Sequence, residues 1–185
     1  YITNGYMTPE ALDMIGPYLD AWRVDVKGFN DEVYQKIARV RNLKGILETA
    51  ERAKNKWKMH VEVVTNIVPD LSDDDKQLRG IASWIKNNLG EMTPWHVTRF
   101  YPQYEMMEYP ATPIETLERA VDIGEREGLK FIYVGNVPGH KNENTYCYRC
   151  KSLVIERSGY NTHLTALKGS KCGYCGADLN IRMPG

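Results

Sequence analysis

The chain has 185 residues, with 24 Lys and Arg against 24 Asp and Glu and 42% hydrophobic residues. This length suits one ordinary domain with a small additional module. The balanced charge gives no indication of nucleic acid or of an anionic membrane as a partner. No stretch approaches the roughly 18 consecutive apolar residues of a transmembrane helix, and the N-terminus lacks the basic and apolar regions of a secretory signal. We therefore expect a cytoplasmic protein.

Five short runs of β-branched and aromatic residues alternate with longer segments of helical periodicity. This alternation is typical of parallel strands joined by crossover helices. The expected strands are residues 1–3, 22–27, 58–68, 95–100 and 130–134.

Helix starts are marked by capping residues between these strands. Thr8 and Pro9 begin the first helix, because a Thr N-cap followed by Pro is a common start signal. Residues 31–56 are expected to be helical, with a break near Arg41 and Asn42. The acidic stretch 72–75 caps a third helix, and residues 112–115 begin a fourth.

An eight-unit (βα) barrel takes about 250 residues, or roughly 30 for each unit. Residues 1–139 are too short for such a barrel, so we expect a partial TIM-like (βα) barrel in this range. An unpaired edge on its first strand must then be covered by something else, or it promotes association. Residues 140–185 are expected to form a separate C-terminal module.

The four cysteines lie close together in that module, as Cys147, Cys150, Cys172 and Cys175. Two C-x2-C pairs resemble the spacing of zinc ribbons, in which tight turns direct four thiolates to one ion. Four protein ligands leave no open coordination position, so we expect a structural zinc. A rubredoxin-like iron and cysteines without metal remain alternatives, and His163 is a possible substitute ligand.

Chemistry in parallel α/β folds gathers at the carboxyl ends of the strands. Asp25 and Lys27 stand two residues apart on one strand and therefore face the same side. They are either a structural ion pair or a ligand site. We expect His96 to be a buried, hydrogen-bonded structural residue, whereas Arg99 is a candidate for holding an anion. The Tyr- and Met-rich segment 101–109 is either a substrate lid or packing beneath a loop.

Several of these segments together resemble the AmmeMemoRadiSam system radical SAM enzyme, a family similar to the pyruvate formate-lyase activating enzymes. The likeness covers nearly the whole chain, and the order of its parts is specific. It rests on residues 3–5, 24–27, 61–69, 98–102 and 134–140 and on the closing cysteine pairs.

The resemblance implies a partial barrel that binds S-adenosylmethionine and a 4Fe-4S cluster, with cleavage of the sulfonium to a 5′-deoxyadenosyl radical. It assigns Asp25, Val26 and Lys27 to contacts with S-adenosylmethionine, with the lysine pairing to the methionine carboxylate. Thr3 and Asn4 would adjoin the same pocket.

The chain departs from this family in its cluster motif. No C-x3-C-x2-C loop and no Gly-Gly-Glu stretch are present, so the ligands of the 4Fe-4S cluster are not in this sequence. We therefore expect the C-terminal portion of a radical SAM enzyme, which forms part of the S-adenosylmethionine pocket and acts on an unknown substrate. Radical generation would need the cluster-binding N-terminal segment or a partner that supplies it. The alternative is a zinc-ribbon protein-binding module on an inactive barrel scaffold, and an unrelated TIM-like enzyme is disfavoured because no acid/base pair converges at the strand ends.

Overall fold

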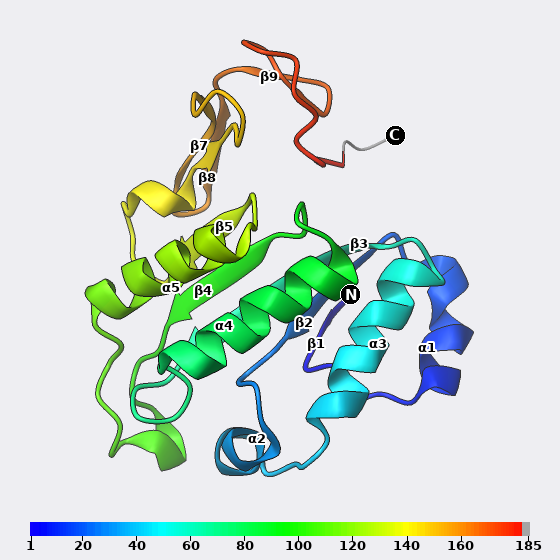
Figure 1. The fold of residues 1–185 in the computed structure, drawn as a ribbon, viewed down its shortest axis with the longest axis vertical. Helices are drawn as coiled ribbons and strands as arrows, with labels where there is room; N and C mark the ends of the chain where they lie inside the picture. Colours follow the sequence, from blue (N-terminus) through cyan, green and yellow to red (C-terminus); the bar gives the residue numbers. More distant parts are fainter. Residues whose placement is uncertain (183–185) are drawn as a thin grey trace.

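The computed structural model describes residues 1–182 and has a parallel five-stranded sheet followed by two small antiparallel sheets (Figure 1). The strands of the parallel sheet lie side by side in chain order, and each pairs in parallel with the next. They are β1 (Ile2–Thr3), β2 (Ala21–Asp25), β3 (His60–Ile67), β4 (Trp95–Arg99) and β5 (Ile132–Gly135). This confirms the expected α/β class, with an open sheet of five βα-type strands.

The crossover segments contain five α-helices and several shorter turns of helix. The α-helices are α1 (Pro9–Ile15), α2 (Asp31–Ala38), α3 (Leu43–Asn55), α4 (Asp75–Trp84) and α5 (Ile114–Glu127). The shorter turns are η1 (Gly16–Tyr18), the π-helical η2 (Ile85–Leu89) and η3 (Tyr104–Met106), and a further turn, η4 (Lys141–Glu143), follows β5.

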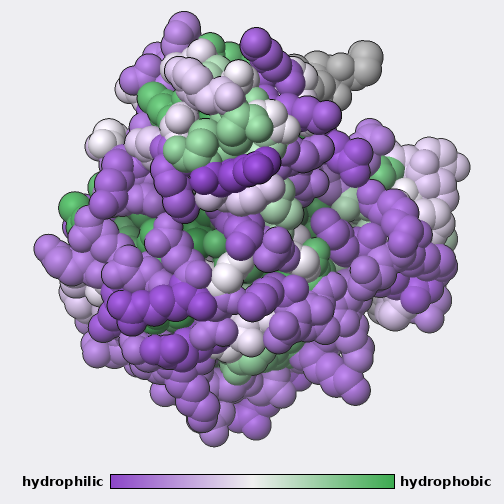
Figure 2. Space-filling model, turned by 45° about the horizontal axis from the view of Figure 1, so that its top comes forward, coloured by the Kyte–Doolittle hydropathy of each residue, from purple (hydrophilic) through white to green (hydrophobic). Residues whose placement is uncertain are grey.

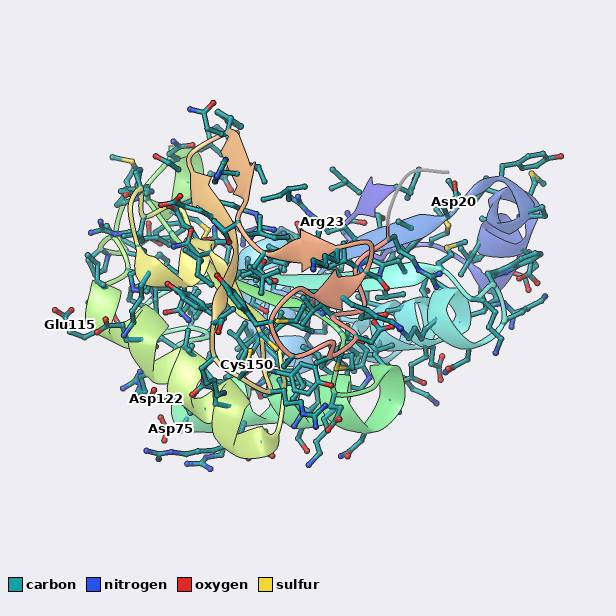
Figure 3. All side chains as sticks on the ribbon, turned by 90° about the horizontal axis from the view of Figure 1, so that it is seen from above. Asp20, Arg23, Asp75, Glu115, Asp122 and Cys150 are labelled. Carbon is teal, nitrogen blue, oxygen red and sulfur yellow. The ribbon has the colours of Figure 1, made fainter. Side chains whose placement is uncertain are left out.

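The helices cover one face of the sheet. We call the other face, which no helix of the crossover segments covers, the open face. Alternate residues such as Trp22, Val63 and Val97 are fully buried beneath the helices, as the two-residue period of strands requires. The residues between them, including Arg23 and Glu62, are exposed or half-buried. In Figure 3, Arg23 lies on the side of the sheet away from α4 and α5. The face that would line a closed barrel is therefore the open one.

Local capping signals explain where several helices begin. The Thr8 hydroxyl accepts the Ala11 N–H and Asp74 accepts the N–H groups of the first turn of α4. The break between α2 and α3 occurs at Arg39, which adopts a left-handed φ of 59°, and Asn42 caps α3. These features confirm the starts and the break that the sequence predicts.

The start of α5 depends on a contact between distant segments. The helix begins at Ile114, and no side chain caps it. The Thr112 hydroxyl is instead fully buried, accepts the Phe100 N–H at 2.8 Å and donates to the Ile67 carbonyl at 2.6 Å. Thr112 thus joins the carboxyl ends of β3 and β4.

The segment after β5 forms the C-terminal module. Its strands are β6 (Thr145–Tyr146), β7 (Leu153–Ser158) and β8 (Asn161–Leu164) in one sheet, with β9 (Leu167–Lys168) and β10 (Lys171–Cys172) in another. A second hydrophobic cluster, which includes Phe131, Val154 and Leu179, joins this module to the amino end of β5.

The surface is mostly hydrophilic on the face shown in Figure 2, with small separate hydrophobic areas. No helix in residues 1–182 combines the length and apolar character that a membrane crossing requires.

Candidate functional site

Asp25 and Lys27 form an ion pair where β2 leaves the sheet. Lys27 Nζ lies 3.1 Å from Asp25 Oδ2, and the two side chains are 27% and 35% exposed. Asp25 is in register with Val64 on the open face, and this row continues through His96. The pair is half-buried at the carboxyl edge of that face. An ammonium has three donors, so Lys27 keeps hydrogen-bonding capacity beyond its contact with Asp25.

Tyr34 lies on the buried side of the sheet and holds the backbone where β2 ends. Its ring is 1% exposed, its hydroxyl accepts the Lys27 N–H at 2.9 Å, and it lies 3.4 Å from the Asp25 carbonyl. Burial raises the pKa of Tyr34 to about 12, which keeps the hydroxyl neutral. The sequence alone does not identify Tyr34, because its contact depends on how α2 packs against the end of β2.

The resemblance also assigns Thr3, Asn4 and Val26 to the pocket, and the surroundings of their side chains differ from those of the Asp25–Lys27 pair. Thr3 is in register with buried Val24 on the covered face, and its hydroxyl accepts the Gly5 N–H. Asn4 is exposed and accepts the Tyr6 N–H. Val26 is fully buried. Thr3 and Val26 therefore offer the open face only their backbone groups, whereas the Asn4 side chain is accessible.

The turn after Asn4 needs a glycine. Gly5 has a φ of +74°, and a Cβ at this position would lie 2.7 Å from Ile46 and 2.9 Å from Val24. Only glycine satisfies both the backbone conformation and the close approach. This turn therefore holds β1 and α3 together directly beside Asn4.

The neighbouring strands add polar groups to the same edge. Asn66 and Thr98 share a hydrogen bond of 3.3 Å, and the Asn136 amide donates to the Arg99 carbonyl. The guanidinium of Arg99 donates to the Thr112 carbonyl and to the Tyr101 hydroxyl. Arg99 thus fixes the loop that follows β4, and these contacts account for two of its donors.

In the aromatic segment after β4, some side chains are packed against a small hydrophobic cluster and others are exposed. Met106 and Tyr109 pack on a small cluster of Val68, Leu71 and Phe100. Tyr104 and Met107 are exposed instead. The loop is joined to the end of α2 by an ion pair of 3.2 Å between Arg39 and Glu105.

The four cysteine sulfurs of the C-terminal module converge on one point. The ligand atoms of Cys147, Cys150, Cys172 and Cys175 all lie within 4.8 Å of one another. Two of the sulfur pairs are 3.6 and 3.7 Å apart. A tetrahedral site with Zn–S bonds of about 2.3 Å places its sulfurs about 3.8 Å apart. The donor set and the spacing therefore fit a tetrahedral metal ion.

The two C-x2-C turns have the same backbone design. The Lys151 N–H donates to the Cys147 carbonyl, and the Gly176 N–H donates to the Cys172 carbonyl. Lys151 and Gly176 each follow the second cysteine of their pair and have positive φ values of 61° and 72°. Both turns thus direct their sulfurs to the same side, which the spacing predicts. His163 lies on exposed β8 and is not part of this group.

No protein-family profile matches the sequence. A curated relative, the uncharacterized protein MJ0808 of Methanocaldococcus jannaschii, is 42% identical over 182 residues, which are 97% of this chain and 53% of the relative. The chain therefore spans about half the length of the curated relative it matches.

Two solved structures resemble the chain at 15% sequence identity. One is a domain of pyruvate-formate lyase-activating enzyme from Bacteroides vulgatus, with a TM-score of 0.62 over 72% of this chain and 79% of the other. The second is a radical SAM methyltransferase from Sphaerobacter thermophilus, with a TM-score of 0.58 over 72% of this chain and 38% of the other. The chain has a radical SAM-like fold.

Proposed function

We propose that this chain is the C-terminal portion of a radical S-adenosylmethionine enzyme and forms part of the cofactor pocket. The observation that carries the proposal is the half-buried Asp25–Lys27 pair at the carboxyl edge of the open sheet face. This is the edge at which parallel α/β folds bind ligands. The radical SAM-like fold supports the same assignment.

The pair suits the methionine end of S-adenosylmethionine, which carries a carboxylate and an ammonium. Lys27 would hold the carboxylate, because its ammonium is positively charged and keeps donors beyond its contact with Asp25. Asp25 would keep Lys27 in place and accept from the ligand. The Asn4 side chain and the backbone at Thr3 and Val26 would border the same pocket, and Tyr34 would hold the strand end that positions them. When bound, the cofactor supplies a carbon radical for hydrogen abstraction.

The 4Fe-4S cluster requires ligands from outside this sequence. All four cysteines belong to the C-terminal group, so the cluster-binding loop would come from a preceding segment. The curated relative is about twice as long as the region it shares with this chain, which leaves room for such a segment. We also propose that residues 1–139 are the barrel unit and residues 140–185 a separate module with a structural zinc.

The test compares this chain with a longer protein that includes the preceding segment. After anaerobic reconstitution with iron and sulfide and reduction, the longer protein should release 5′-deoxyadenosine from S-adenosylmethionine, and this chain alone should not. A 4Fe-4S absorption band in the short chain would contradict the assignment of its cysteines. A longer protein that binds a cluster but never cleaves the cofactor would contradict the enzyme proposal.

The second candidate is a protein-binding module on an inactive scaffold. It is favoured by strand β8, in which every residue is exposed and Leu164 is 54% exposed. Tyr160 at the preceding turn is also fully exposed. This candidate predicts no binding of S-adenosylmethionine by the longer protein.

A further inference from the structure

A cavity lies near the amino ends of β3, β4 and β5, and its lining residue His96 is two strands away from Asp25 in the same register row. It has a volume of about 510 Å³ between the open face of β3–β5 and the C-terminal module. Small-molecule sites in proteins commonly have volumes of roughly 300–1,000 Å³. Its walls combine apolar side chains, such as Phe131, Ile155 and Leu179, with a few charged groups.

Glu62 is held at the floor of this cavity by two histidines. His60 Nε2 lies 3.3 Å from one carboxylate oxygen, and His96 Nε2 lies 3.1 Å from the other. These contacts hold the pKa of Glu62 well below its usual range, first through His60 and then through His96. Glu62 is therefore ionised, and both of its oxygens already have a donor.

The guanidinium of Arg157 faces the same cavity from β7 and has a different set of partners. It donates to the Thr145 hydroxyl at 2.7 Å and to the Glu143 carbonyl at 3.1 Å, and it lies 5.4 Å from the centre of the Tyr133 ring. All of these partners are neutral. Within residues 1–182, Arg157 forms no ion pair with a carboxylate.

The negative groups of the cavity therefore have hydrogen-bond donors, whereas the Arg157 guanidinium has no negatively charged partner among the described residues. Both carboxylates that line the cavity have donors: Glu62 accepts from His60 and His96, and Glu143 accepts the Gly139 N–H at 2.9 Å. The positive charge of Arg157 has only neutral acceptors. A partly enclosed cation of this kind favours an anionic ligand, and the planar fork of arginine matches a carboxylate.

We propose that this cavity binds a small planar organic acid, with its carboxylate on Arg157 and its ring against the apolar wall of Phe131, Ile155 and Leu179. The stack of His96 on Tyr133, with ring centroids 5.1 Å apart, and the Arg157 guanidinium over the Tyr133 ring hold these three groups together beside the proposed ligand. Asp25 and Lys27 do not line this cavity, so the inference does not depend on the proposed cofactor pocket.

Benzoate is a suitable probe, with benzylamine as a cation of nearly the same shape. The ring signals of the four histidines are followed by NMR in the zinc-loaded chain and assigned with single His→Gln variants. Benzoate should shift the His60 and His96 signals saturably and leave His163 on exposed β8 unchanged. Benzylamine should produce no saturable shift over the same concentration range.

Two arginine variants separate a specific contact from a general loss of charge. Arg157→Gln should weaken benzoate binding about tenfold or more, whereas Arg126→Gln, on the exposed face of α5, should leave it unchanged. The proposal is overturned if benzoate gives no saturable shift, if benzylamine binds equally well, or if a folded Arg157→Gln chain binds benzoate undiminished. Should Arg157→Gln fail to fold, the comparison of benzoate with benzylamine in the unaltered chain still decides the question.

Discussion

Lys27 and Asp25 are joined at 3.1 Å, and each side chain keeps about a third of its surface exposed. An ion pair exposed to this degree contributes little to folding, because water screens the attraction and ordering two side chains has an entropic cost. The proposed binding role and a structural role therefore predict different effects of removing the charge of Asp25.

Asp25→Asn tests that distinction. We expect its free energy of unfolding in urea to change by less than about 1 kcal/mol. In the longer protein, the same substitution should weaken binding of S-adenosylmethionine because Lys27 loses its anchor. A large loss of stability with unchanged binding would make the pair structural.

Thr112 should be far more important for stability. Thr112→Val keeps the shape of the side chain but leaves the Phe100 N–H and the Ile67 carbonyl without their buried partner. We expect a loss of about 1–3 kcal/mol in the free energy of unfolding, measured by urea denaturation. Thr112→Ser retains the hydroxyl and should recover most of that loss. Equal destabilisation by both variants would show that packing of the methyl group, and not hydrogen bonding, is responsible.

Glu62 should contribute to the acid sensitivity of the fold. Its pKa in the folded chain is lower than its ordinary value of 4.5, so its stabilising effect is present above that value and is lost as the pH falls below it. Glu62→Gln cannot titrate. The stability advantage of the unaltered chain over this variant should therefore shrink between pH 6 and pH 3, as measured by urea denaturation at each pH. A difference that does not vary with pH would contradict the two histidine contacts.

The metal site should control the folding of the C-terminal module. Four thiolates in so small a module bind a metal with free energy that is largely folding free energy. We expect one zinc per chain by elemental analysis, and removal by a chelator should increase hydrogen exchange in residues 145–179 while the parallel sheet stays protected. A metal-free module that keeps its protection would refute a structural metal.

The sequence predicts those features that depend on neighbouring residues. The five strands, the caps at Thr8 and within residues 72–75 and the two C-x2-C turns are each specified within a few residues, and the structure confirms them, with Asp74 as the capping residue of the acidic stretch. The sequence also predicts that His96 is hydrogen-bonded, but its partner Glu62 is not predictable because the two meet through strand register. The contacts of Tyr34 and Thr112 are not predictable either, since each joins segments that only tertiary packing brings together.

The affinity of the longer protein for S-adenosylmethionine, compared between the unaltered chain and Lys27→Met, tests the central proposal most directly. Methionine keeps much of the length of the lysine side chain and removes its charge. If Lys27 holds the methionine carboxylate, equilibrium binding should weaken by about 1–3 kcal/mol, or roughly 5- to 150-fold, while Arg126→Gln should have no effect. Unchanged affinity in a folded Lys27→Met protein would contradict the proposed pocket.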